Sequence, residues 1–112
     1  MKSNNDSFRA KKKKTLLLVE DEALIALSQA KMLKKYGFDV YTAYNGDKAI
    51  ETVNEQEIDL ILMDIDLGYG RMDGTETAKR ILQTRDIPIV FLTSHSEKEY
   101  VDRVKEITGY GY

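Results

Sequence analysis

The stretch Ile58-Asp-Leu-Ile-Leu-Met-Asp64 decides how this sequence folds. Its residues 60–63 are apolar without interruption, which is typical of a strand covered on both faces and not of a strand with one wet face. Asp64 ends this run, and packing alone would not place a carboxylate there. We therefore expect residues 58–63 to form a buried parallel strand that delivers Asp64 to a functional position.

Three further runs have the same apolar character, and helical segments separate the four. The other expected strands are 15–19, 38–43 and 87–92. Helices are expected over 22–36, from an Asn45 cap to Val53, from Asp73-Gly74 to near Thr84, and from near Ser96 onward. Their inward residues are predicted to be Leu24, Leu27, Lys31 and Leu33; Ala49, Ile50 and Val53; Ala78, Ile81 and Leu82; and Tyr100, Val101, Val104 and Ile107. Alternating strands and helices of this length predict an α/β fold with a parallel sheet and right-handed crossovers.

Composition limits the class of protein. The 112 residues are 42% hydrophobic and 32% charged, which suits one globular domain. The absence of cysteine excludes disulfides and thiolate metal sites and agrees with a reducing cytoplasm. No apolar run approaches the roughly 20 residues that cross a bilayer, and the N-terminus lacks a signal-peptide core. We expect a cytoplasmic domain with no membrane partner.

The charge is unevenly distributed along the chain. Residues 1–14 carry six basic side chains against Asp6, a net charge of +5, so residues 15–112 carry −7. A basic arm of this kind can bind nucleic acid, but no interleaved aromatic residues or second basic patch follow it. We interpret it as a flexible, solvated leader and expect no direct nucleic-acid partner. The acidic body fits a cation site better.

Polar residues follow three of the expected strands. They are Glu20 and Asp21, then Asp64 and Asp66, then Thr93 and Ser94. Ligands gather outside the carboxyl ends of the strands in such sheets. Taken singly, the acidic pair also suits a helix N-terminus, and the hydroxyls suit helix caps. Together they predict a cleft whose crowded carboxylates need a hard cation such as Mg²⁺, Ca²⁺ or Mn²⁺, beside which an aspartate can attack phosphorus.

Four motifs carry a resemblance to a known family. They are Val19-Glu-Asp-Glu22, Leu62-Met-Asp-Ile-Asp66, Met72-Asp-Gly74 and Pro88-Ile-Val-Phe-Leu-Thr-Ser94. Residues 15–112 resemble the receiver domains of bacterial and archaeal response regulators and hybrid kinases. The resemblance implies a flavodoxin-like, doubly wound parallel sheet of order 2-1-3-4-5.

The resemblance also implies a function. The domain would take a phosphoryl group from a histidine kinase or phosphotransfer protein and then switch conformation, acting on itself and not as an enzyme. A second copy of the chain, forming a homodimer, is a further alternative as a partner. The implied site has Asp64 as phosphoacceptor, Thr93 as switch hydroxyl, Tyr112 as aromatic switch, and Glu20, Asp21, Asp64 and the Asp66 backbone carbonyl around Mg²⁺. His95 would line the rim of this site or be an ordinary exposed loop residue.

The sequence departs from the family pattern in three places. The acidic pair is Glu20-Asp21, where two aspartates are commoner, and the loop 67–72 is longer than usual and lacks a proline. The family's phosphate-pairing lysine would fall three positions beyond Tyr112. We therefore expect a C-terminally incomplete domain over 15–112, with the fifth strand cut and the last helix missing.

Two other functions compete with this prediction. Asp64-Ile-Asp66 also matches the nucleophile motif of haloacid-dehalogenase-type phosphohydrolases, whose later lysine, second acidic pair and cap domain do not fit in 112 residues. A pseudo-receiver, which binds partners without phosphoryl chemistry, is the third reading. The absent lysine favours it, whereas Asp64, Thr93 and both acids oppose it.

Overall fold

The computed structural model describes residues 13–64 and 72–92. These residues form strands β1 (Thr15–Val19), β2 (Asp39–Ala43), β3 (Leu60–Asp64) and β4 (Ile89–Leu92), and helices α2 (Ala23–Lys35), α3 (Gly46–Glu55) and α4 (Gly74–Leu82). All four predicted strands are present, although three of them begin one or two residues later than predicted. The helix expected near Ser96, the basic leader up to residue 12 and the fifth strand lie outside the described residues.

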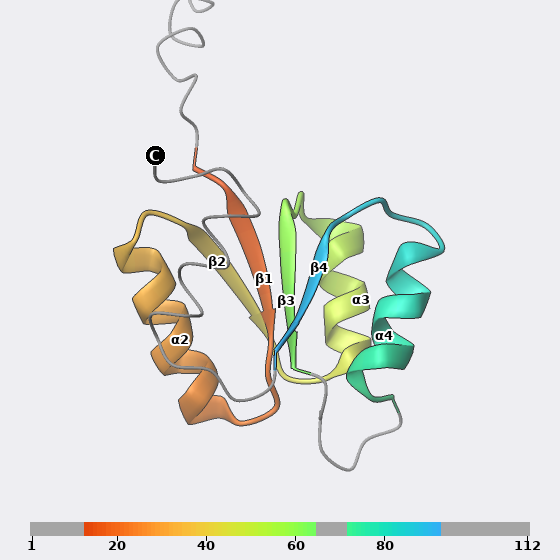
Figure 1. Ribbon diagram of the computed structural model, residues 1–112, viewed down its shortest axis with the longest axis horizontal. Coiled ribbons are helices and arrows are strands. Elements are labelled where there is room, and N and C mark those ends of the chain that lie inside the picture. Colours follow the sequence, from red (N-terminus) through yellow and green to blue (C-terminus); the bar gives the residue numbers. More distant parts are fainter. Residues whose placement is uncertain (1–12, 65–71, 93–112) are drawn as a thin grey trace, which may run out of the picture.

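The strands form one parallel sheet in the order β2-β1-β3-β4. Helix α2 lies on one side of this sheet, and α3 and α4 lie side by side on the other (Figure 1). The predicted doubly wound α/β fold is therefore confirmed, with the described strands in the expected order. Since all described strands run in one direction, their carboxyl ends share one edge of the sheet, where Glu20, Asp21 and Asp64 lie.

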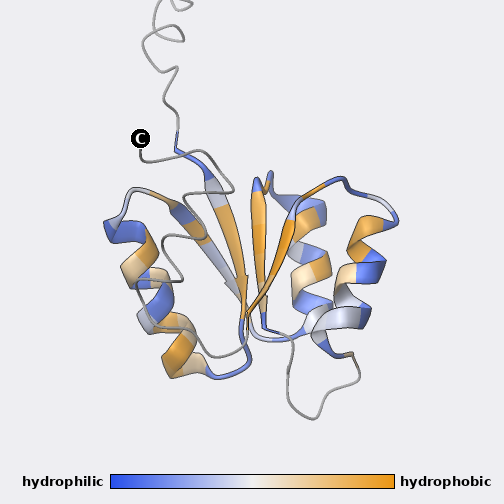
Figure 2. Cartoon of the chain, in the orientation of Figure 1, coloured by the Kyte–Doolittle hydropathy of each residue, from blue (hydrophilic) through white to orange (hydrophobic). Residues whose placement is uncertain are grey.

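The sheet is buried on both faces, as the uninterrupted apolar runs predict. The core on the α2 side contains Leu16, Leu18, Ala26, Ala30, Leu33, Phe38, Leu60, Leu62, Val90 and Leu92. The core on the α3 and α4 side contains Leu17, Val19, Ala43, Ala49, Val53, Ile58, Ile61, Met63, Ala78 and Ile81. Residues 16–19 of β1 and 60–63 of β3 alternate between the two cores, so these stretches are apolar without interruption, whereas the helices mix polar and apolar residues (Figure 2).

The predicted inward face of α2 was wrong at three positions. Leu24 and Leu27 are 81% and 66% exposed, and Lys31 is exposed as well. The buried residues of the helix are Ala26, Ala30 and Leu33. These three are spaced by four and three residues and form one narrow stripe of largely small side chains. Small side chains let the helix lie close to the sheet, so the stripe of larger leucines turns to the surface. The predicted stop is confirmed, because Gly37 has a φ of 100° directly after the helix.

Side-chain caps begin α3 and α4 where the sequence predicts them. The Asn45 side chain accepts a hydrogen bond from the Lys48 backbone N–H, and the Asp73 side chain accepts one from Glu76 N–H, both at 2.8 Å. In α4 the prediction for Leu82 was wrong, because this side chain is 53% exposed. The buried position is taken by Thr77, which lies on the same stripe as Ile81.

No helix within residues 13–64 and 72–92 is both long enough and apolar enough to cross a membrane.

Candidate functional site

The carboxyl ends of β1 and β3 bring acidic residues from distant parts of the sequence together. These two strands are hydrogen-bonded neighbours, and Val19 lies opposite Met63. The next residue of each chain segment is acidic, Glu20 in one case and Asp64 in the other. Parallel register therefore places both at the same edge of the sheet, and Asp21 follows immediately before α2.

Glu20, Asp21 and Asp64 form one cluster of carboxylates. One oxygen from each side chain lies within 4.8 Å of the other two. Glu20 is buried and Asp64 is half-buried, whereas Asp21 lies on the exposed side of the cluster. The sequence predicted that these three residues share a cleft, and the described structure brings them together.

The Glu20 segment is held firmly in place by backbone hydrogen bonds. Its N–H donates to the Ala43 carbonyl at 3.0 Å, which extends the pairing of β1 and β2 by one residue. Its Oε2 accepts from the Glu22 N–H at 3.2 Å, so the carboxylate also fixes the turn that leads into α2. The side chain is only 9% exposed. A carboxylate is thus fixed in a place where little water reaches it.

The environment of Glu20 strongly disfavours its charged form. The pKa of Glu20 is raised from 4.5 to about 7, first by burial and then by the negative charges of Asp64, Asp21 and Glu22. The hydrogen bond from the Glu22 backbone acts in the opposite direction and lowers the pKa. Glu20 is therefore only partly ionised at neutral pH.

A hard divalent cation fits this donor set. Three carboxylate oxygens within 4.8 Å of one another supply the ligand type that Mg²⁺, Ca²⁺ and Mn²⁺ prefer. The carboxylates of Asp64, Asp21 and Glu22 add to the burial that raises the pKa of Glu20, and a cation would neutralise this negative charge. The few protein ligands leave room for water and for an oxygen of a phosphoryl group, which is the usual arrangement around Mg²⁺.

The third strand end belongs to β4. In the register of β3 and β4, Asp64 lies opposite Leu92, the last residue of the strand. Thr93 follows Leu92 in the sequence. Thr93 itself lies outside the described residues, as do three other predicted site residues, Asp66, His95 and Tyr112.

The structure adds a feature near this edge that the sequence analysis did not identify. Gly46, at the start of α3, packs directly against Thr77 and Met72 at the start of α4. Both partners are buried. The only hint in the sequence is a glycine directly after the Asn45 cap, a position where many residues are acceptable. A close approach between two helices cannot be deduced from one glycine.

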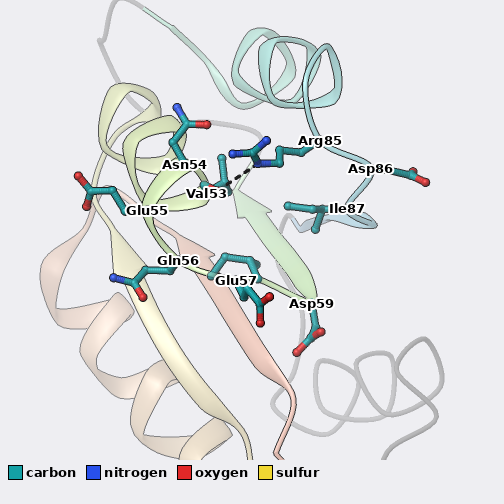
Figure 3. Close-up of a pocket in the computed structure, with 10 residues that line it drawn as sticks. Val53, Asn54, Glu55, Gln56, Glu57, Asp59, Arg85, Asp86 and Ile87 are labelled. Carbon is teal, nitrogen blue, oxygen red and sulfur yellow. Dashed lines mark hydrogen bonds between the residues drawn. The ribbon is translucent and has the colours of Figure 1, made fainter.

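A hollow of about 560 Å³ lies at the opposite edge of the sheet, between the end of α3 and the segment that leads into β4. Arg85 lies in it and donates from Nε to the Val53 carbonyl at 3.3 Å, satisfying a carbonyl near the end of α3 (Figure 3). Acidic side chains, among them Glu57, Asp59 and Asp86, surround it. Since none of the clustered carboxylates lines this hollow, we assign it a structural role in joining α3 to the sheet.

Comparisons with known proteins agree on one family. The family model of the response regulator receiver domain matches residues 16–112. The chain is 35% identical over 98 residues to the transcriptional regulatory protein PdtaR of Mycobacterium tuberculosis, covering 87% of this chain and 47% of that protein. It therefore spans about half the length of the curated relatives it matches.

Solved structures give the same result. The N-terminal domain of a response regulator/sensory box/GGDEF three-domain protein from Carboxydothermus hydrogenoformans is 34% identical with a TM-score of 0.74, covering 87% of this chain and all of that domain. The response regulator TrrA of Thermotoga maritima, solved in complex with Mg²⁺-BeF, is 26% identical with a TM-score of 0.70, covering 86% of this chain and 96% of that one. With its sheet order and strand-end carboxylates, this chain belongs to the response regulator receiver domains of two-component signalling.

Proposed function

We propose that this receiver domain accepts a phosphoryl group on Asp64 with the help of Mg²⁺ and passes the signal on by changing conformation. The observation that carries the proposal is the cluster of Glu20, Asp21 and Asp64 oxygens at the carboxyl edge of the sheet. The solved complex of TrrA with Mg²⁺-BeF supports it by analogy, since that relative is 26% identical to this chain.

Asp64 is the nucleophile in this proposal. It ends β3, half-buried, where a donor can reach it while the strand holds its backbone. A carboxylate oxygen of Asp64 forms a bond to phosphorus as the bond between phosphorus and the donor's imidazole nitrogen breaks, and the released imidazole takes up a proton from water. The phosphoryl group moves and no redox change is involved.

Glu20 and Asp21 hold the cation in this proposal. When bound, Mg²⁺ neutralises the clustered carboxylates and the charge on the phosphoryl oxygens. Glu20 has to lose its proton to take part, and its pKa of about 7 means that it does so close to neutral pH. Asp66, through its backbone carbonyl, is the proposed fourth contributor.

The phosphodonor is a histidine kinase or a histidine phosphotransfer protein, and the readout is a change around the end of β4. Phosphorylation adds charge and acceptor oxygens to Asp64, opposite Leu92. Thr93, one residue further along the chain, is the proposed hydroxyl that donates to the new group, and Tyr112 is the proposed aromatic residue that responds. His95 is proposed at the rim.

Intact-mass measurement tests the phosphoacceptor. The full-length protein that contains this sequence is treated with acetyl phosphate and Mg²⁺, and one added phosphoryl group is expected. Asp64→Asn should abolish the addition, whereas the control Asp59→Asn, just before the same strand, should be labelled like the wild type. If Asp64→Asn is labelled as fully as the wild type, Asp64 is not the acceptor. If the wild type binds Mg²⁺ but is never labelled, the domain is a binding module without phosphoryl chemistry.

A further inference from the structure

Gly46 occupies a tight notch between the first turns of α3 and α4. It is the first residue of α3 and is buried. A methyl group on its Cα would overlap the Thr77 hydroxyl oxygen and would lie 3.2 Å and 3.3 Å from Cε and Cβ of Met72. The notch is therefore too small for any side chain larger than hydrogen.

The two residues that form the notch cannot easily move aside. Thr77 is completely buried, and its Oγ1 donates to the Asp73 carbonyl at 2.8 Å. To move away from Gly46, the Thr77 hydroxyl would have to give up this hydrogen bond inside the core. Met72 is 8% exposed and directly precedes Asp73, whose side chain caps α4. A larger residue at Gly46 would therefore displace the start of one helix from the start of the other.

The α3 side of the notch is connected to the clustered carboxylates. Ala43 lies three residues before Gly46, and its carbonyl accepts the hydrogen bond from Glu20 N–H at 3.0 Å. A shift of the start of α3 away from α4 therefore acts on the segment that holds Glu20.

We propose that Gly46 is a positioning residue for the phosphoryl site: by lacking a side chain, it sets the spacing of α3 and α4 and thereby, through Ala43, the placement of Glu20. This inference rests on the proposed function of Glu20. Gly46 itself touches neither the cation nor the phosphoryl group.

The expected effect is large enough to measure. Displacement of site groups by about 1 Å can lower a rate by on the order of a hundredfold. Loss of a residue that orients metal ligands commonly weakens metal affinity by about tenfold or more. Gly46→Ala should therefore weaken Mg²⁺ binding by roughly tenfold and slow phosphorylation of Asp64 at saturating donor.

The decisive experiment is a double-mutant cycle of Gly46→Ala and Thr77→Ala. Mg²⁺ affinity is measured from the amide chemical shifts of Glu20, Asp21 and Asp64 in the wild type, both single variants and the double variant. Because Thr77→Ala removes the overlapping hydroxyl, the double variant should recover most of the Mg²⁺ affinity that Gly46→Ala loses. Such recovery would not follow from a general loss of stability.

Gly37→Ala is the matched control. Its glycine has a φ of 100°, so alanine is strained there, but it ends α2 at the opposite edge of the sheet. This variant should lose stability and keep the Mg²⁺ affinity of the wild type. If Gly46→Ala proves too unstable to fold, the double variant stands in for it and should bind Mg²⁺ about as the wild type does.

Two results would overturn the inference. One is a folded Gly46→Ala protein with unchanged Mg²⁺ affinity, and the other is a double variant that binds Mg²⁺ as poorly as Gly46→Ala or does not fold. Failure of the proposed function gives a different result. In that case the wild type is not phosphorylated, while Mg²⁺ affinity still reports whether Gly46 positions the carboxylates.

Discussion

Replacing Glu20 with glutamine should make the metal-free domain more stable at high pH, although it removes a proposed metal ligand. The folded-state pKa of Glu20 is about 7, against 4.5 for an exposed glutamate. Between these values the folded chain holds a proton that the unfolded chain has lost. The contribution of Glu20 to folding stability is therefore fully present below about pH 4.5. It decreases as the pH rises and is lost above about pH 7.

The shift gives the size of the effect. One pKa unit corresponds to 1.36 kcal/mol. The shift of Glu20, discounted for the water that reaches the cleft, then amounts to on the order of 2 kcal/mol at about pH 8. The uncharged amide of Glu20→Gln does not incur this penalty. The free energy of unfolding of Glu20→Gln should therefore rise relative to that of the wild type by about this amount between about pH 5 and pH 8.

Urea unfolding followed by circular dichroism measures this difference at each pH. Because histidine side chains ordinarily titrate in this range, both proteins should carry His95→Gln, which removes the single histidine of the chain. With saturating Mg²⁺ the order should reverse at high pH, since the cation stabilises the charged carboxylate of the wild type and has less to bind in Glu20→Gln. A difference that stays flat from about pH 5 to pH 8 without Mg²⁺ would show that Glu20 is not a buried, crowded carboxylate.

Other predictions concern the cap, the core and the switch. Asn45→Ala should lower the free energy of unfolding by about 1 kcal/mol, because it removes the acceptor for Lys48 N–H, and urea unfolding measures the loss. In the same assay Leu33→Ala should cost about 2–5 kcal/mol, since this side chain is fully buried. Leu27→Ala, in the same helix but 66% exposed, should change stability by no more than about 0.5 kcal/mol. In the full-length protein Thr93→Ala should still be phosphorylated but should not show the hydrogen-exchange response of the wild type to beryllofluoride; an identical response would exclude this hydroxyl as the relay.

The fold could be predicted from the sequence because its strands carry an unambiguous signal. Apolar runs such as 60–63 require cover on both sides, and the segments between the runs are long enough for helices. The helix caps Asn45 and Asp73 were equally predictable, since a local hydrogen bond decides them. These features depend on residues close in sequence.

The inward face of α2 could not be predicted in the same way. The sequence shows two possible stripes on this helix, one with Leu24 and Leu27 and one with Ala26 and Ala30. Hydrophobicity alone favours burial of the leucines. In the structure the alanines are buried instead, because their small side chains fit a helix packed closely on the sheet. The same reason applies to Gly46, whose importance lies in how closely α4 approaches. Such distances are set by the whole packing arrangement and not by any local pattern.

The carboxylate cluster depends on the rigidity of the two strands that carry it. Strands β1 and β3 are held by fully buried residues such as Val19 and Met63, so the residue that follows each strand has little freedom to move away. Glu20 is buried at this position beside Asp64, and its raised pKa follows first from the burial and then from the neighbouring negative charges. If the strand ends were flexible, Glu20 would become more accessible to water and would move away from Asp64, so its pKa would fall toward 4.5. We therefore expect core variants near these strand ends to weaken Mg²⁺ binding even where every proposed ligand is intact.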